Sequence, residues 1–345
     1  MSIFDISGKI TEKNYDVSGN VVSTLYDINK NKIVLLENPL LDSAMLYCSD
    51  YLKNEPQAFA FPLMTDVHLN FKGEEPKYIE RKQPNIWSRM IFLGDMINNY
   101  DTTALDNAVA FMNGTSLNKI IVMGNHELGN GADVLPLATE WYKPLLDSSS
   151  VLWDGGDGLI YYSDDEENNV RYIVLDSCTP TYKPSGVQLY TKNELEWCAS
   201  VMENAGDKNI IICNHAIGSS FNLVTNPEES ISSTTITNNG VLNKIINAFI
   251  NKSTYDVKDD NDITHSHDFS KCGGNFIGHF SGHEHRLGYT NASGFNKFNC
   301  PMLKEWYSVY TQAVSFFIID KALRKVIWLV CDYTKETFDK YEYTY

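Results

Sequence analysis

The stretch Asn275-Phe276-Ile277-Gly278-His279-Phe280, followed closely by Gly282-His283-Glu284-His285, decides how the rest of the chain is interpreted. The apolar run predicts a buried strand, and a glycine and two histidines come where that strand should end. Residues two apart along an extended chain point to the same side, so both imidazoles can reach one pair of metal ions. A short motif recurs by chance, so this one needs support from elsewhere in the sequence.

Four further motifs also follow hydrophobic runs. They are Asp66-Val67-His68, Gly94-Asp95, Gly124-Asn125-His126-Glu127 and Asn214-His215. The runs before them are short and apolar, as buried strands are, and helical patterns such as 104–112 and 191–205 lie between. Such alternation predicts a largely parallel or mixed sheet covered by helices, whose ligands bind beyond the carboxyl ends of the strands. All five motifs fall at such ends.

The composition is that of an ordinary globular protein with an acidic surface. The 345 residues are 43% hydrophobic, and the formal net charge is −16. Nucleic acids and anionic membranes bind clustered lysine and arginine side chains, so the acidic charge disfavours both partners. It remains compatible with a phosphate substrate, because bound cations can dominate the electric field at a binding site. The seven cysteines lack CxxC spacing, which favours reduced core thiols. Neither a signal peptide nor a membrane-spanning run is visible, so we expect a cytoplasmic protein.

The first part of the chain, residues 1–55, differs from the remainder. Short β-prone runs (21–26 and 33–36) alternate with turn residues, and Pro39 opens a helical pattern over 40–52. We expect a β/helix extension over 1–55, packed on the main domain or docking elsewhere, and a main domain over 56–345. Two polar stretches, 216–240 and 252–274, are expected to be long loops. The β-prone runs 308–319 and 326–332 are expected to belong to a second sheet.

Aspartate and histidine together are ligands that suit manganese, zinc or iron better than magnesium or calcium. A carboxylate between two such cations can bridge them. The two cations lower the pKa of a water that they share, so that a bridging hydroxide exists near neutral pH. This hydroxide can attack a phosphorus atom in line with the leaving group. Each motif alone would more often be a solvated loop, a helix N-cap or a turn. Five of the eight histidines nevertheless fall in strand-end motifs, and that conjunction favours a two-metal site.

The ordered set DxH, GD, GNHE, NH and GHxH resembles the calcineurin-like metallophosphoesterase superfamily over roughly residues 58–290. The resemblance implies an α/β sandwich in which two mixed β-sheets are flanked by helices. The ligand set that it implies for two divalent ions is Asp66, His68, Asp95, Asn125, His215, His283 and His285. Within that set Asp95 would bridge the two ions. His126 would not be a ligand and would instead contact the phosphate and protonate the leaving oxygen.

Departures from subfamily patterns narrow the expected activity. Met96-Ile97-Asn98-Asn99 follow Gly94-Asp95, whereas related protein serine/threonine phosphatases carry GDxxDRG, so their Asp-Arg pair is missing here. Asn98 also stands where purple acid phosphatases have a ligand tyrosine. We therefore predict a metal-dependent phosphoesterase acting on phosphodiesters or small phosphomonoesters. The alternatives are a nuclease of the same superfamily, and a binding or assembly protein, for example viral or cell-surface, on a retained phosphoesterase scaffold. Substrate, metal identity and oligomeric state stay open.

The residues outside the motifs are expected to play structural roles. We interpret His279 as a packing residue of its strand, His265 and His267 as loop residues, and Arg89 and Arg286 as solvated surface.

Overall fold

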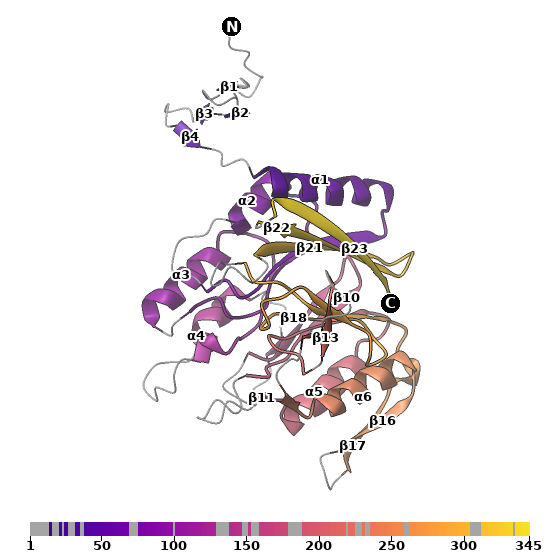
Figure 1. Cartoon of the computed structure of the whole chain (residues 1–345). Helices are drawn as coiled ribbons and strands as arrows, with labels where there is room; N and C mark the ends of the chain where they lie inside the picture. The colour runs from indigo at the N-terminus through magenta and orange to yellow at the C-terminus, as the bar shows by residue number, and fades with distance from the viewer. Residues whose placement is uncertain are drawn as a thin grey trace.

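The structure is a computed structural model of the whole chain. It describes residues 38–345 except 69–74, 99–100, 129–137, 147–150, 153–158, 179–187, 219, 225–229, 232–234, 259–262, 304–311 and 334, together with four short strands before residue 38. Two mixed β-sheets stack face to face, and helices cover their outer faces, as Figure 1 shows from α1 at the top to α5 and α6 at the bottom. The predicted fold class, an α/β sandwich, is confirmed.

The first sheet has six strands in the order β23-β22-β21-β5-β6-β7. Strands β5 (Ala58–Met64), β6 (Met90–Phe92) and β7 (Lys119–Ile121) are parallel to one another. Strands β21 (Ala313–Asp320), β22 (Lys325–Asp332) and β23 (Thr337–Thr344) extend the sheet with antiparallel pairs. Three parallel strands therefore end together at one side of this sheet.

The second sheet has nine strands in the order β14-β13-β19-β20-β18-β12-β10-β9-β8. Its centre is the parallel set β10 (Val170–Val174), β12 (Asn209–Cys213), β18 (Phe276–Ser281) and β20 (Lys297–Asn299). The remaining strands are β8 (Val151–Leu152), β9 (Tyr161–Asp165), β13 (Phe221–Leu223), β14 (Ser230–Ile231) and β19 (Gly288–Thr290). The strands before the NH and GHxH motifs, β12 and β18, are hydrogen-bonded neighbours.

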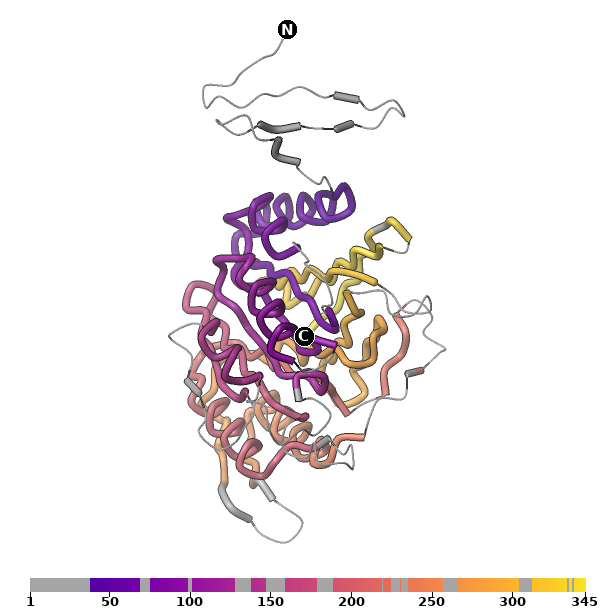
Figure 2. The backbone as a smooth tube through the Cα atoms, turned by 90° about the vertical axis from the view of Figure 1, so that its left-hand side faces the viewer, coloured from indigo at the N-terminus to yellow at the C-terminus, as the bar shows by residue number. Residues whose placement is uncertain are grey.

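Helices cover both outer faces. Helix α1 (Pro39–Asn54) begins at the N-cap Asn38, whose side chain accepts a hydrogen bond from the Leu41 amide, and it packs on the six-stranded sheet beside the C-terminal strands (Figure 2). Helices α2 (Glu75–Lys82), α3 (Thr102–Met112) and α4 (Ala138–Tyr142) follow it. Helices α5 (Lys192–Glu203) and α6 (Asn239–Ile250) pack on the nine-stranded sheet, and a capping box formed by Thr191 and Glu194 starts α5.

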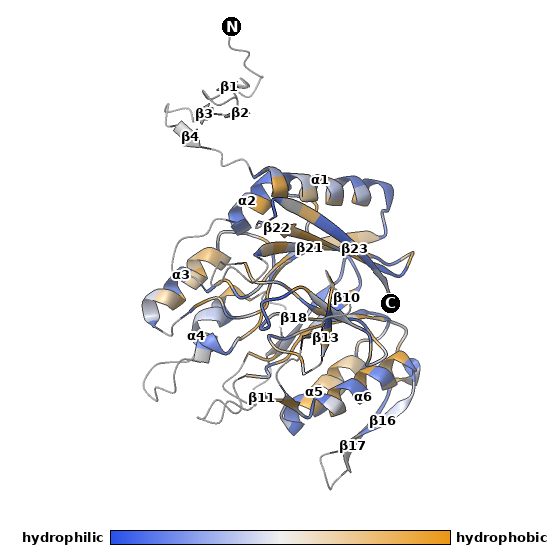
Figure 3. Ribbon diagram, in the orientation of Figure 1, coloured by the Kyte–Doolittle hydropathy of each residue, from blue (hydrophilic) through white to orange (hydrophobic). Residues whose placement is uncertain are grey.

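Aromatic residues from both sheets form the core between them. The ring centroids of Phe61 and Phe317 lie 5.5 Å apart, those of Phe280 and Phe317 lie 4.9 Å apart, and Phe298 contacts Trp328 edge-on at 5.7 Å. All five side chains are fully buried. Figure 3 shows hydrophobic residues along β21 and β22 and hydrophilic residues along the outside of α1. This apolar layer fixes the two sheets relative to each other and thereby positions the loops at their carboxyl ends.

The expectation that 252–274 is a loop is wrong. Strands β16 (Thr254–Lys258) and β17 (Ile263–Asp268) form an antiparallel hairpin that packs against α5 and α6. Its strand character depends on those tertiary contacts, which polar local sequence does not reveal. The other polar stretch, 216–240, contains the short strands β13, β14 and β15 (Ile236–Thr237), of which β15 pairs with β11 (Gln188–Leu189). Strand β23 was not anticipated.

Before residue 38 the chain forms two small antiparallel pairs, β1 (Asn14–Tyr15) with β2 (Val21–Val22) and β3 (Thr24–Tyr26) with β4 (Lys32–Val34). The domain boundary near residue 55 stays a prediction, although α1 itself packs on the main sheet. All seven cysteines are buried and free, as expected. Among the described residues no helix combines the length and apolarity needed to cross a bilayer.

Candidate metal centre

The five motifs meet because strands from both sheets end on the same side of the sandwich. Asp66 and His68 follow β5, Asp95 follows β6, and Asn125 follows β7, all in the six-stranded sheet. The remaining candidates follow neighbouring strands of the nine-stranded sheet: His215 comes after β12, and His283 and His285 come after β18. Each sheet therefore contributes one half of the cluster.

The backbone at this cluster is unusual. Asp66, His68, Asp95, His283 and His285 all have positive φ, between 44° and 71°, and they make up half of the ten described non-glycine residues in that region. A left-handed conformation costs roughly 1–2 kcal/mol for such residues and persists only where the surroundings fix it. Hydrogen bonds from the Asp66 amide to the Gly94 carbonyl (3.0 Å) and from the His68 amide to the Asp95 carbonyl (2.9 Å) do so here.

Two motif glycines allow the loops to approach closely. A Cβ atom on Gly94, which has φ of 88°, would lie 2.8 Å from Nδ1 of His215 and 2.7 Å from the Gly124 amide nitrogen. A Cβ atom on Gly282 would overlap the hydroxyl of Thr65 and a carboxylate oxygen of Asp66. Any larger residue at either position would separate the candidate ligands, so the glycines are needed for the cluster to form.

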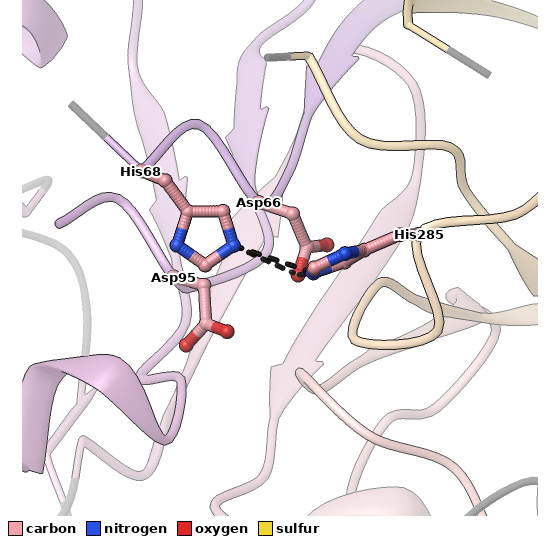
Figure 4. A group of neighbouring side chains, drawn as sticks. All are labelled: Asp66, His68, Asp95 and His285. Carbon is pink, nitrogen blue, oxygen red and sulfur yellow. Dashed lines mark hydrogen bonds and ion pairs between the residues drawn. The ribbon is translucent and has the colours of Figure 1, made fainter. Parts of the chain in front are cut away.

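The first group of candidate ligands is Asp66, His68, Asp95 and His285, whose ligand atoms all lie within 4.8 Å of one another (Figure 4). The two Nε2 atoms of His68 and His285 face each other at 3.3 Å. Oδ1 of Asp66 lies 3.0 Å from Nε2 of His285 and 4.0 Å from Nε2 of His68. The other oxygen, Oδ2, accepts hydrogen bonds from the Thr65 hydroxyl (2.7 Å) and the His283 amide (2.9 Å), so Oδ1 is directed into the cluster.

The second group is Asp95, His215 and His283, and Asn125 adjoins it. Nε2 of His215 lies 3.1 Å from Oδ2 of Asp95, 3.3 Å from Nδ1 of His283 and 3.2 Å from Oδ1 of Asn125. The other ring nitrogen, Nδ1, donates to the Leu93 carbonyl at 2.7 Å, because a carbonyl oxygen can only accept. That bond directs Nε2 into the cluster, where it can bind a metal once the ring has given up its second proton, which is the arrangement of a metal-binding histidine.

The distances between these atoms fit a coordination shell. Metal–ligand bonds of about 2.1 Å place neighbouring ligand atoms about 3.0–3.4 Å apart in octahedral or tetrahedral geometry, and opposite octahedral ligands about 4.2 Å apart. The observed separations of 3.0, 3.1, 3.2 and 3.3 Å match neighbouring ligands, and the 4.0 Å between Asp66 and His68 approaches the opposite case. Carboxylate, amide oxygen and imidazole at these separations fit divalent cations. The buried Asp/His cluster can therefore hold metal ions.

Burial and neighbouring charges shift the pKa values of the clustered side chains. Burial raises the pKa of Asp95, but the charge and the hydrogen bond of His215 outweigh this and hold that pKa well below its usual value. Burial lowers the pKa of His215, and the charge of Asp95 opposes this and raises the pKa to about 10. Burial lowers the pKa of His68 and of His283 to about 4 each, so these rings are neutral. His68 and His283 are thus in the neutral state in which imidazoles bind metals, whereas His215 would release a proton when a metal binds.

His126 lies beside the cluster on the short helix η1 (His126–Leu128). Its Nδ1 donates to the Asn98 carbonyl at 2.7 Å, and its Nε2 lies 3.9 Å from Oδ2 of Asp95. The side chain is 31% exposed, whereas that of Asp95 is 2% exposed. Its ring also contacts His68 edge-on, with centroids 4.6 Å apart. His126 is thus at the solvent side of the cluster and outside both ligand groups.

Glu127 is a functional residue that sequence reasoning missed. Its buried carboxylate accepts hydrogen bonds from the amides of Gly124 (2.7 Å), Asp95 (2.9 Å) and Met96 (2.6 Å), and from the hydroxyl of Tyr142 (3.2 Å). It therefore ties the loop after β6 to the loop after β7. The sequence signal was available, since an acid directly after a strand-end histidine is placed to bind loop amides.

The structure also shows the positions of the histidines and the arginine that lie outside the motifs. His279 is buried in β18, as expected, and its Nε2 also bonds to Oδ1 of Asn214 at 2.7 Å, directly beneath the loop that carries His215. His267 is not a loop residue: it is buried in β17 and bonds to Glu203 at 2.8 Å. Arg89 is not at the surface, because it is buried and its guanidinium donates to Ser163 (2.9 Å) and the Asp164 carbonyl (2.7 Å). The side chain of His265 lies outside the described residues.

Comparison with known proteins gives weak structural similarities. No family model and no curated protein matches this sequence. Vacuolar Protein Sorting 29 from Cryptosporidium parvum is 10% identical, with a TM-score of 0.35 over 84% of this chain and 99% of that one. A phosphopantetheinyl hydrolase from Mycobacterium tuberculosis is 12% identical, with a TM-score of 0.36 over 72% and 92%. A predicted phosphoesterase from Streptococcus pneumoniae TIGR4 is 8% identical, with a TM-score of 0.32 over 83% and 98%. Values this low carry no inference about activity.

The sheets and the cluster agree with the architecture that the sequence motifs predicted. Two mixed sheets are stacked, and Asp, His and Asn side chains from five strand ends converge at one side. The fold that the resemblance implied, an α/β sandwich of two mixed sheets flanked by helices, is confirmed. One fold can host different functions, so the activity has to be argued from the cluster.

Proposed function

We propose that this protein is a dinuclear metal-dependent phosphoesterase that hydrolyses phosphodiesters or small phosphomonoesters. The observation that carries the proposal is the pair of ligand groups that share Asp95. A carboxylate common to two groups is the feature that a two-metal site requires, because it allows both cations to be held close together. A single-metal site would need only one of the two groups.

Seven residues would hold the metals in this proposal, with Asp66, His68 and His285 on one side, Asn125, His215 and His283 on the other, and Asp95 between them. Two divalent cations would neutralise charge on the phosphoryl oxygens and supply a nucleophilic water near neutral pH. Manganese, zinc and iron all suit this mixture of carboxylate, amide and imidazole ligands.

The chain itself would supply a proton through His126. The bond from Nδ1 to the Asn98 carbonyl fixes the ring, and Nε2 is the nitrogen directed to the cluster. A protonated Nε2 would bind a phosphate oxygen and donate its proton to the leaving oxygen. Glu127 would hold the loop after β6 and the loop after β7 together through its bonds to the Asp95 and Gly124 amides. Partial exposure of His126 leaves room for a substrate on that side.

The test is metal analysis combined with hydrolysis of 4-nitrophenyl phosphate and bis(4-nitrophenyl) phosphate. Wild-type protein loaded with manganese or zinc should bind about two ions per chain, and Asp95→Asn should lose metal together with about 1,000-fold in turnover. Asp320→Asn is a matched control, since Asp320 is also buried but lies at the far end of β21, where it bonds to Tyr51. It should keep its metals and its turnover.

The outcomes separate the proposal from its alternatives. Higher turnover of the diester would indicate a phosphodiesterase, and higher turnover of the monoester a phosphatase. A folded wild-type protein that binds no manganese or zinc and hydrolyses neither compound would refute the proposal and favour a binding or assembly role. Cleavage of single-stranded DNA at rates well above those of the small diester would favour the nuclease alternative.

A further inference from the structure

A cavity lies at the other end of β18 from the metal centre. It has a volume of about 280 Å³ and is lined by the half-buried Lys252 and Asn275, the exposed Arg324 and the nearly buried Phe276 and Phe295. Residues 274–276 lead into β18, whereas His283 follows that strand. At about 3.3 Å per residue the two sites are therefore roughly 20 Å apart. The cavity is between the end of α6 and the C-terminal end of β23, on the side of Figure 1 where the C-terminus is marked.

The charge of this cavity is opposite to that of the chain. The whole sequence has 44 acidic residues and 28 lysines and arginines, yet the described residues that line the cavity include two cationic side chains and no Asp or Glu side chain. Neither Lys252 nor Arg324 forms an ion pair with a carboxylate in the described part of the chain. Burial lowers the pKa of Lys252, and the neighbouring charge of Arg324 lowers it further. Nζ of Lys252 donates to the Gly274 carbonyl and lies 4.0 Å from the centre of the Phe249 ring, but these partners do not neutralise its charge. Two cations without a carboxylate side-chain partner beside one cavity attract an anion.

The inner wall is aromatic. Phe276 and Phe295 are nearly buried, and their rings meet edge-on with centroids 5.1 Å apart. Tyr345 also lines the cavity, and the guanidinium of Arg324 lies 5.8 Å from the centre of its ring. Aromatic walls with a few polar groups at the entrance are typical of pockets for small organic ligands, and flat apolar bodies stack well on such walls.

We propose that this cavity binds a small organic oxyanion, a phosphate or a carboxylate carried on a flat apolar body. The oxyanion pairs with Lys252 and Arg324, and the flat body packs against the aromatic wall. The volume suits a molecule no larger than a mononucleotide, since pockets for larger ligands begin at about 300 Å³. This site is independent of the metal centre and of the proposed hydrolysis.

The test is calorimetric binding of adenosine 5′-monophosphate, benzoate, inorganic phosphate and neutral adenosine. We expect adenosine 5′-monophosphate or benzoate to bind more tightly than phosphate or adenosine, and to weaken as salt is added. Tighter binding of the nucleotide would identify a phosphate ligand, and tighter binding of benzoate a carboxylate ligand. Lys252→Gln combined with Arg324→Gln should weaken the preferred probe about tenfold or more, because glutamine keeps a polar side chain but removes the charge.

Two controls separate this site from the rest of the surface. Lys53→Gln combined with Lys143→Gln makes the same change in net charge away from the cavity and should leave binding unchanged. Asp95→Asn alters the metal centre and should also leave it unchanged. Arg324→Gln alone, an exposed turn substitution, repeats the test if the double variant fails to fold. Absence of binding by both organic anions at about 1 mM, or equal binding by the cavity variants and wild type, would overturn the proposal.

Discussion

Replacing Glu127 with glutamine is expected to weaken both the fold and metal binding. In the native protein one carboxylate oxygen, Oε2, accepts from the Gly124 and Asp95 amides, and the other, Oε1, accepts from the Met96 and Ile97 amides at 2.6 and 3.3 Å. Glutamine can place an oxygen on only one side. On the other side, the NH2 group of glutamine then faces two backbone N–H groups. Two hydrogen bonds are lost, and the NH2 group and the two N–H groups, which are all donors, repel one another.

The magnitude follows from those two bonds. A hydrogen bond to a charged group contributes about 1.5–3 kcal/mol, and removing the buried charge itself returns part of that loss. We therefore expect the free energy of unfolding to fall by about 3 kcal/mol and the Tm to fall by about 4 °C. Because the Asp95 and Asn125 loops are no longer tied together, the affinity for manganese or zinc should also fall by about 10–100-fold.

The assay is thermal unfolding with and without manganese, together with a metal titration. The control is Glu194→Gln, since Glu194 is an equally buried carboxylate that accepts from the Asp176 amide at 2.7 Å and caps α5. That variant should lose stability but keep its metal affinity. If Glu127→Gln binds metal as tightly as wild type while losing stability, the positioning role assigned to Glu127 is wrong.

Three further predictions follow from other parts of the structure. His126→Ala should keep both metals and lose most turnover, because its ring lies outside both ligand groups; loss of metal in direct analysis would contradict its position. Gly282→Ala should abolish tight metal binding, because the new methyl group overlaps the Thr65–Asp66 pair, whereas Gly240→Ala in helix α6, which has open space around it, should gain up to about 1 kcal/mol in chemical unfolding. Lys297 has its pKa lowered by burial to about 8, below that of an unfolded lysine, so the unfolded chain binds the extra proton between about pH 8 and 10.5 and stability should rise with pH there. Lys297→Met should remove about 3 kcal/mol of that rise when urea unfolding is compared at the two pH values.

The strands that precede the motifs could be predicted because their local patterns are strong. Runs such as 58–64 and 209–213 are apolar throughout and end in polar residues, and both are strands with those bounds. Helix α5 was predicted for similar reasons, from apolar residues at helical spacing, and the structure shows in addition a capping box at its start. The convergence of the motifs then required only that strand ends gather at one side of a sandwich.

Other features depend on contacts that local sequence does not encode. The motif strands divide between two sheets, β5 to β7 in one and β12 with β18 in the other, and strand order is set by pairing across long separations. The hairpin β16–β17 is polar along its length and takes its strand form where it packs on α5 and α6. The role of Glu127 also appears only when its loop neighbours are brought together in space.

The division of the cluster between the two sheets has a mechanical consequence. Asp66, Asp95 and Asn125 follow strands of the six-stranded sheet, and His215 and His283 follow strands of the nine-stranded sheet. Cations held among them would therefore link the two sheets. Each ion would then resist sliding of the layers as well as unfolding of its own loops. Removal of the metals by a chelator should therefore weaken the packing between the two sheets. Backbone amide hydrogen exchange should then become faster in β6 and in β12 at the same time.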